Sequence, residues 1–192
     1  MPTNKQSAIW GSFWQIVNLS IKLIIDYEGI VSDQELTRKF PQMETAYSDA
    51  IIVHVAKIFS NSKNESFRLG KFKTICRTEI KTEIEDVENE YKDIIGKIVT
   101  NRNKLVAHLD REFYNLPFSK NSIERMRQSM AQYLNIDLQE AQAIFGSMTT
   151  TTDKSKERYA IGDLGDDLPR IKEMLTKLDS IWSRSIPFIE SA

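Results

Sequence analysis

The sequence predicts an all-α protein with a single domain that spans residues 1–192. Apolar residues recur along most of the chain at the three- and four-residue spacing of amphipathic helices. No strand pattern alternates with these stretches, and no internal repeat is evident. The composition, with 41% apolar and 28% charged residues, is ordinary for a globular protein that buries a core of its own.

The N-terminal segment predicts one long helix followed by a short one. Residues 6–28 place their apolar side chains on one broad face, and Gly29 marks the expected end of this helix. The short helix is expected to begin near Ser32, because Ser32 and Glu35 have the spacing of a capping box. It should end before Pro41, since a proline disfavours helical backbone at the residue before it.

The centre of the chain predicts two further helices. Residues 42–59 are apolar on most sides, and although the β-branched run 51–53 is compatible with a strand, the length and the flanking pattern favour a helix. After a short basic and aromatic stretch, the longest helix is predicted from about Thr78 to about His108. Its acidic first half and basic last turns suit the dipole of a helix.

The C-terminal part predicts three more helices. After a connection at 111–121, short helices are expected near 122–133 and 137–147, separated at Asn135. Residues 148–166 are polar and are expected to form a mobile loop within the same domain. A last amphipathic helix should begin near Pro169, because proline is favourable in the first turn.

Charge and cysteine content limit the classes of function. With 26 Lys and Arg against 27 Asp and Glu, the net charge is -1, so any nucleic acid must bind a local patch. The single Cys76 fits a reducing cytoplasm. No secretory signal and no run of about 20 apolar residues is visible, so we expect a cytoplasmic protein without a membrane segment. Neither a glycine-rich phosphate loop nor Cys/His metal spacing is present, and we expect no metal and no cofactor.

The most chemically specific stretch is Asn-Arg-Asn-Lys-Leu-Val-Ala-His-Leu-Asp at residues 101–110, where the longest predicted helix ends. Arg102 interrupts an apolar stripe, which indicates an interface or a site. RNA cleavage without a metal needs a base, an acid and a cation for the phosphorane charge, and His108 and Arg102 are suitable residue types. Six residues of straight helix subtend about 240° and rise roughly 9 Å, so these side chains diverge unless the helix breaks.

One chain offers one histidine for this chemistry, because His54 lies in a stripe that resembles a core face. A twofold homodimer would bring two copies of Arg102 and His108 together. A structural interpretation stays open beside this one, in which His108 caps the end of its helix and Arg102 pairs with an acidic side chain.

The string formed by Arg102, Asn103, Lys104 and the following Ala-His108-Leu-Asp resembles the HEPN superfamily (higher eukaryotes and prokaryotes nucleotide-binding), most closely its AbiU type from phage abortive infection. Residues 48–59 also resemble the second helix of that group. The resemblance implies a HEPN-like helical bundle with a long central helix that ends in the Arg-Asn-x4-His motif. It further implies a homodimer with facing motifs, metal-independent endoribonuclease activity, and an antitoxin such as a nucleotidyltransferase as a partner. By position, Arg102 would stabilise phosphate charge, His108 would transfer protons, and Asn103 would orient the phosphate or the histidine.

Five basic residues are candidate RNA contacts. They are Lys97 and Lys104 in the last turns of the longest predicted helix, and Arg68, Lys71 and Lys73 in the basic and aromatic stretch before it, which is suited to holding a single strand. The functional prediction is a metal-independent endoribonuclease that acts on RNA in phage defence or as the toxin of a toxin–antitoxin pair. The alternative is a non-catalytic helical protein that binds a partner, a nucleotide or RNA through the same dimer surface.

Overall fold

The structure is a computed structural model that describes residues 3–62, 67–103, 117–145, 148, 150–159 and 164–185. Within these ranges the chain is mostly helical, and the β structure amounts to an isolated bridge between Phe118 and Thr150. The prediction of an all-α fold is confirmed for this part of the chain.

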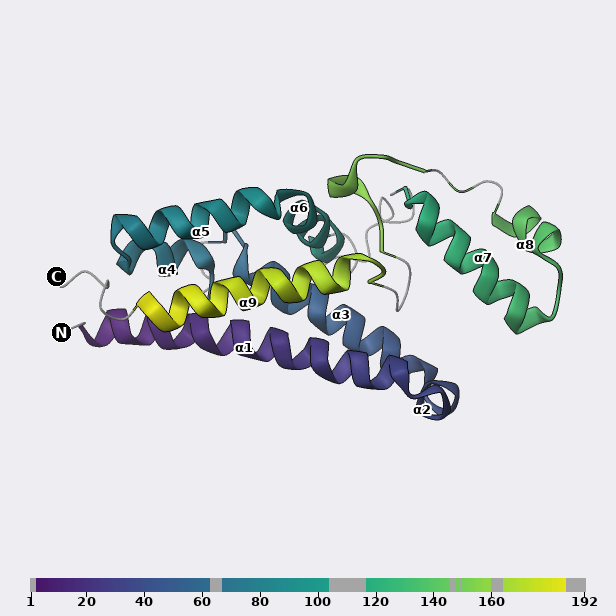
Figure 1. The fold of residues 1–192 in the computed structure, drawn as a ribbon, viewed down its shortest axis with the longest axis horizontal. Helices are drawn as coiled ribbons and strands as arrows, with labels where there is room; N and C mark the ends of the chain where they lie inside the picture. Colours follow the sequence, from purple (N-terminus) through teal and green to yellow (C-terminus); the bar gives the residue numbers. More distant parts are fainter. Residues whose placement is uncertain are drawn as a thin grey trace.

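The helices follow one another with short connections. In chain order they are α1 (Asn4–Ser32), α2 (Gln34–Lys39), α3 (Pro41–Ile58), α4 (Leu69–Ile75), α5 (Thr78–Glu90), α6 (Lys92–Asn101), α7 (Lys120–Leu134), α8 (Leu138–Phe145), the 3-10 turn η3 (Lys154–Lys156) and α9 (Asp167–Ser185). Helix α1 packs on α3 and α9, α5 packs on α9, and α6 packs on α3 and η3. Figure 1 shows these helices as an elongated bundle, with α7 and α8 projecting from one end as a hairpin.

The core lies between α1, α3, α4, α5, α6 and α9. Phe13 and Phe72 stack inside it with ring centroids 4.3 Å apart. At its edge, Trp182 stacks on Trp10 at 4.2 Å, and its indole N–H donates to the Trp10 carbonyl at 3.0 Å. Trp10 and Trp182 therefore join α1 to α9 within one chain.

The first two helix boundaries differ from the prediction by a few residues. Helix α1 continues past Gly29 to Ser32, because Ile30 extends its buried face by one more turn. The cap of α2 is Asp33 and not Ser32: the Asp33 carboxylate accepts the Leu36 N–H at 2.9 Å. Asp33 thus ends α1 and caps the N-terminus of α2, a position at which aspartate is strongly preferred.

The prediction of one continuous helix from about Thr78 is wrong, because the structure divides this stretch into α5 and α6 at Tyr91. Tyr91 leaves helical geometry, with φ -106° and ψ 18°. Its buried ring lies under the cations of Lys177 and Arg170, which belong to α9. The break lets α5 lie along α9 while α6 packs on α3, an arrangement that one straight helix would not allow. The predicted end near His108 lies outside the described residues.

The expected mobile loop at 148–166 contains a well-packed segment, residues 150–159, which we call the strap. The strap includes η3 and lies against α6, and its last residues, Glu157, Arg158 and Tyr159, are buried. The polar composition of this stretch indicated a solvated loop. Composition does not show that polar groups at the end of the strap have hydrogen-bond partners on α6. Helix α9 begins at Asp167, two residues before the predicted Pro169.

Helices α7 and α8 form the predicted pair of short helices. They separate at Asn135, whose left-handed backbone (φ 52°) ends α7. A small second cluster of Phe118 and Ile123, with Met126 and Met130 against it, lies at the base of the hairpin. The hairpin therefore contributes little to the main core.

Among the described residues, α1 is long and apolar enough by length and composition to cross a membrane. Polar residues interrupt its sequence, so it contains no continuous run of about 20 apolar residues. Phe13, Val17 and Ile24 of α1 are packed inside the bundle. Trp14, Leu19, Ile25 and Val31 of the same helix are exposed, so packing in the bundle accounts for only part of the hydropathy of α1.

Substitutions at two helical glycines, Gly11 and Gly96, should have opposite effects on the free energy of unfolding. An added Cβ at Gly11 meets nothing within 4 Å, so Gly11→Ala should raise the free energy of unfolding by about 0.5–1 kcal/mol through helix propensity. At Gly96 a Cβ would lie 3.0 Å from Ser155 Cβ in the strap. Gly96→Val should therefore lower the free energy of unfolding by about 1–3 kcal/mol through overpacking. Urea denaturation measures both, and a Gly96→Val protein as stable as the wild type would contradict this close approach.

Candidate functional site

The motif singled out by the sequence begins at the C-terminal end of α6. Asn101 is the last residue of α6, and Arg102 and Asn103 follow in a wider, π-helical turn. The Arg102 Nη1 donates a hydrogen bond to the Asn103 Oδ1 at 3.0 Å. Arg102 is half-buried and Asn103 is exposed. The structure thus brings two of the three predicted catalytic residues together, while His108 and Lys104 lie outside the described residues.

Asn101 is fully buried and fastens the strap to the end of α6. Its Nδ2 donates to the Lys97 carbonyl at 2.8 Å and to the Glu157 carbonyl at 2.7 Å. Its Oδ1 accepts the Tyr159 N–H at 3.0 Å. The carboxamide therefore binds alternate backbone groups of the strap, as a neighbouring strand would, and satisfies polar groups that burial would otherwise leave unpaired.

Lys97 lies one turn before Asn101 in the centre of a buried charge cluster, which we define as Lys97, Glu157 and Asp167. The Lys97 Nζ is 2.7 Å from the Glu157 Oε2 and 2.8 Å from the Asp167 Oδ2. All three side chains are less than 10% exposed. The cluster joins α6, the strap and the first turn of α9.

This burial corrects the prediction that Lys97 contacts RNA. Lys97 is 5% exposed and is engaged by two carboxylates, so its ammonium is not presented to a phosphate in solution. From the sequence, Lys97 was placed among the basic residues in the last turns of a helix. In the structure its side chain lies on the side of α6 that faces the strap. Its role in this structure is to hold neighbouring segments together.

Tyr159 completes the surroundings of the cluster. The Lys97 Nζ lies 4.2 Å from the centroid of the Tyr159 ring, a cation–π distance. The Tyr159 hydroxyl is buried and interacts with the carboxylate of Asp167. Burial, reinforced by the negative charge of Asp167, raises the pKa of Tyr159 well above its usual value. The phenol therefore stays neutral beside the cluster.

Asn101, Glu157 and Asp167 are residues of this region that were not predicted from the sequence. The available signal was the position of Lys97 and Asn101, which are three and seven residues beyond the buried Ile94 and so share its side of α6. A lysine and an amide on a buried helix face predict polar partners elsewhere in the chain. Identifying those partners needed the fold, because they lie more than 50 residues away in the sequence.

The other candidate RNA contacts lie around α4, whose main packing partners are α1 and α5. Lys73 is half-buried, and its Nζ is 2.6 Å from the Glu88 Oε2 and 3.8 Å from the Glu85 Oε1. The Arg68 Nη1 donates to the Asn61 carbonyl at 3.5 Å, and Lys71 is half-buried. Lys73 is thus neutralised by α5, and none of the three lies on α6 with the motif.

His54 and Cys76 both lie at least partly inside the fold. His54 is half-buried on α3, and its Nδ1 has no hydrogen-bond partner among the described residues. Burial, followed by the charge of Lys57, lowers the pKa of His54. Cys76 is buried at the end of α4. Within the described ranges, no three His, Cys, Asp or Glu side chains gather as a group that could hold a metal ion.

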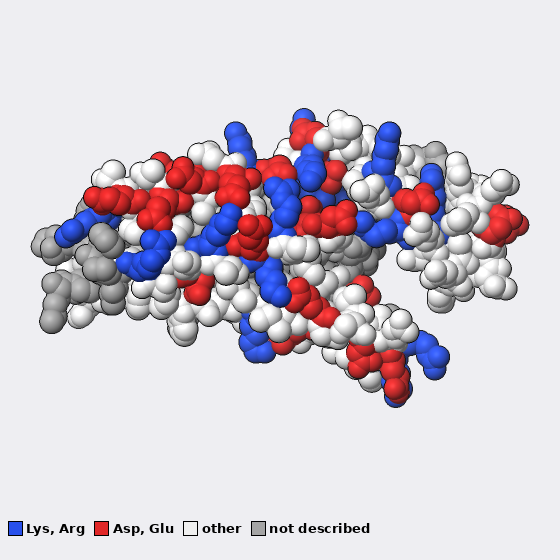
Figure 2. All heavy atoms as spheres, viewed as in Figure 1, with Lys and Arg blue, Asp and Glu red and all other residues white. Residues whose placement is uncertain are grey.

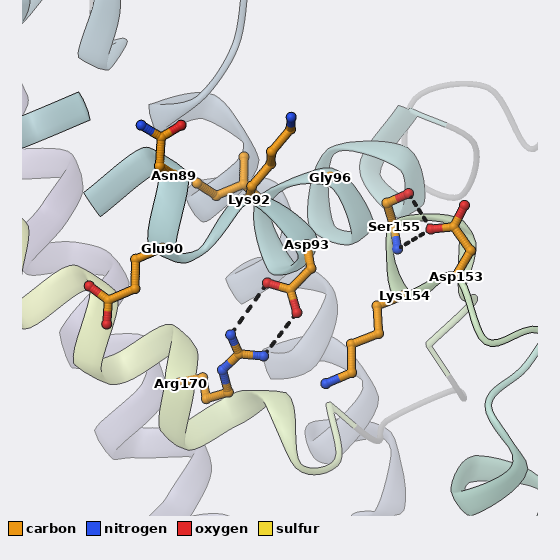
Figure 3. Close-up of a pocket in the computed structure, with 10 residues that line it drawn as sticks. Asn89, Glu90, Lys92, Asp93, Gly96, Asp153, Lys154, Ser155 and Arg170 are labelled. Carbon is orange, nitrogen blue, oxygen red and sulfur yellow. Dashed lines mark hydrogen bonds and ion pairs between the residues drawn. The ribbon is translucent and has the colours of Figure 1, made fainter. Parts of the chain in front are cut away.

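An open groove runs along the seam between α6, α9 and the strap (Figure 3). Asp93 and Arg170 pair across it through two hydrogen bonds of 3.0 and 3.3 Å. Burial opposes ionisation of Asp93, but these bonds hold its pKa below the usual range. Lys154 extends toward this pair from the strap. Asp93 and Arg170 therefore neutralise each other across the seam, whereas Lys92 and Glu90 point away from this pair.

Positive and negative side chains are intermingled on the face shown in Figure 2, with carboxylates gathered along α5. Exposed residues of α5 include Glu79, Glu85, Asp86 and Glu90. A polyanion would meet no broad basic surface on this face. On this face the distribution agrees with the near-zero net charge and leaves room only for a local RNA contact.

No family model, curated protein or solved structure matches this chain. The likeness of residues 101–110 to the HEPN motif therefore rests on the amino-acid sequence of that stretch alone.

Loss of the Lys97 charge should destabilise the protein strongly. Lys97→Met leaves two buried carboxylates without their cation, which should lower the free energy of unfolding by about 3–5 kcal/mol. Lys92→Met, an exposed lysine of the same helix, should change it by less than about 0.5 kcal/mol. Chemical denaturation at neutral pH compares the two. Equal stabilities would mean that the cluster is solvated and not buried.

The raised pKa of Tyr159 predicts a loss of stability at alkaline pH. The folded protein keeps the phenol protonated above pH 10 while the unfolded chain releases the proton. The contribution is therefore fully present below about pH 10 and declines by about 1.4 kcal/mol per pH unit above it. Tyr159→Phe should weaken this decline, whereas Tyr133→Phe, at an 87% exposed position, should leave it unchanged. Denaturation at several pH values from 9 to 11.5 measures the slope, and identical slopes in all three proteins would refute the assignment.

Proposed function

We propose that this protein is a metal-independent endoribonuclease of the HEPN type, acting in phage defence or as the toxin of a toxin–antitoxin pair. The observation that carries the proposal is the pairing of Arg102 and Asn103 at the end of α6. A guanidinium and an amide, hydrogen-bonded to each other and accessible to solvent, are suited to binding a phosphate. The π-helical turn that carries them adds support, since such turns are frequent at functional sites.

The roles follow from the chemistry of RNA cleavage. Arg102 stabilises the charge that develops on the phosphate, and Asn103 orients the phosphate or the histidine. His108 transfers a proton to or from the reacting oxygens, because its usual pKa lies near neutral pH. Lys104 assists as an RNA contact.

A homodimer is the proposed active form. Besides His108 the chain has one histidine, His54, which is half-buried on α3 with an enclosed Nδ1. A second proton-transfer group of the same kind is therefore supplied most simply by a second copy of His108. A twofold axis near the end of α6 would place both copies around one phosphate. An antitoxin such as a nucleotidyltransferase, and a cytoplasmic location, complete the proposal.

The alternative is a non-catalytic helical protein that binds a partner, a nucleotide or RNA. The observation in its favour lies on the projecting hairpin of α7 and α8. Tyr133 is 87% exposed, and Leu138 and Leu134 are 52% and 47% exposed. Large apolar side chains displayed together on a helical hairpin are common at protein-binding surfaces.

Cleavage of a broad RNA pool separates the two functions. The wild type should cleave RNA in excess chelator and leave 2′,3′-cyclic or 3′-phosphate ends, because an internal 2′-hydroxyl is the nucleophile. His108→Ala and Arg102→Ala should each lower the rate by about 10²- to 10⁴-fold. Arg77→Ala removes an exposed arginine outside the motif and should retain the wild-type rate, and His54→Ala should chiefly affect stability.

Two results would replace the nuclease by the binding protein. One is a folded wild type that cleaves no RNA in the pool, and the other is a His108→Ala protein that cleaves as fast as the wild type. Sedimentation of the same preparations at micromolar concentration tests the proposed homodimer.

A further inference from the structure

The position of the Arg102–Asn103 turn depends on the residue directly before it. Asn101 is 0% exposed, and its carboxamide uses both of its N–H donors and its oxygen on protein groups. Exchange of the amide oxygen and nitrogen would oppose like groups at all three contacts, so the amide has one orientation. Asn101 is therefore held at the end of α6 in a single geometry.

The backbone after Asn101 changes from an α-helix to a π-helical turn. The Arg102 N–H lies between two acceptors, the carbonyls of Ile98 and Val99. This change of helix type occurs directly after Asn101, the last α-helical residue. The direction of the Arg102 and Asn103 side chains thus depends on how firmly the last residue of α6 is held.

The buried charge cluster holds the same piece of the strap from a second side. Lys97 binds the Glu157 carboxylate, while Asn101 binds the Glu157 carbonyl. Glu157 is consequently attached to α6 at two points one helical turn apart. Because Lys97 also binds Asp167, the end of α6 is connected to the first turn of α9 as well.

We propose that Asn101 is a positioning residue for RNA cleavage, and that it acts through the strap to set where the Arg102 guanidinium and the Asn103 amide meet the scissile phosphate. This inference rests on the proposed nuclease function. Asn101 itself is enclosed and does not touch the substrate. Displacement of a catalytic group by about 1 Å can lower a rate by about 10²-fold, so a contact one residue away is sufficient to control the reaction.

The test compares Asn101→Ala with Ser20→Ala in single-turnover cleavage of RNA. Ser20 is also 0% exposed and donates one side-chain hydrogen bond, but it lies on α1 outside the strap contacts. Asn101→Ala should lower the rate at saturating protein by about 10- to 100-fold, with less than about a threefold change in the protein concentration at half-saturation. Ser20→Ala should match the wild type once rates are corrected for the folded fraction. If both variants match the wild type after this correction, Asn101 has only a structural role and the inference fails.

A second readout is independent of cleavage and keeps the two proposals distinguishable. Asn101→Ala should speed amide hydrogen exchange at Arg102 and Asn103 and shift the NMR signal of the Arg102 Nε–H, while Ser20→Ala should do neither. Unchanged exchange and an unchanged signal overturn the positioning role, whatever the activity. A wild type that cleaves no RNA overturns the nuclease instead.

A milder variant serves if Asn101→Ala does not fold. Gly96→Ala keeps every strap hydrogen bond but places a Cβ 3.0 Å from Ser155 Cβ, so the strap must shift by a few tenths of an ångström. It should lower the saturating rate in the same direction as Asn101→Ala, though by less. A Gly96→Ala protein with the wild-type rate and the wild-type Arg102 signal would overturn the inference.

Discussion

The pairing of the Lys97 ammonium with the carboxylates of Glu157 and Asp167 links three segments that are distant in sequence. Two negative charges and one positive charge are enclosed there, and enclosed charges are tolerated when each has partners. Lys97 supplies that partner for both carboxylates, and hydrogen bonds from Asn101 satisfy the adjoining backbone. The path of the strap over α6 follows from this arrangement, since the strap brings few apolar side chains of its own.

Helical periodicity in the sequence identified the fold class because the core is built from helix faces. The stripes of α1, α3 and α9 are regular, and their apolar residues are the ones that the structure buries. The break at Tyr91 was not predictable in this way, because the apolar spacing continues through it. A tertiary contact decides it: the ring of Tyr91 packs under cations of α9, and this contact leaves no trace in the local pattern.

The sequence could propose a candidate site only from residues that are neighbours in the chain, and its catalytic role stays a prediction. Arg102 and Asn103 were identified together and lie together, because adjacent positions at the end of one helix stay close in any fold. Lys97 was assigned to the surface because lysine is rarely buried. Its true environment depends on carboxylates 60 and 70 residues away, which no local pattern reports.

The location of the motif at this junction has a consequence for any function that it carries. A helix end surrounded by solvent frays, and side chains beyond it sample many directions. The end of α6 differs, since Asn101 and Lys97 bind the strap within one turn of Arg102. The ordering of this turn is supplied by folding, so a phosphate that binds there does not have to provide it. A catalytic or binding site gains from such preorganisation, and the buried charge cluster supplies it here as a by-product of joining α6, the strap and α9.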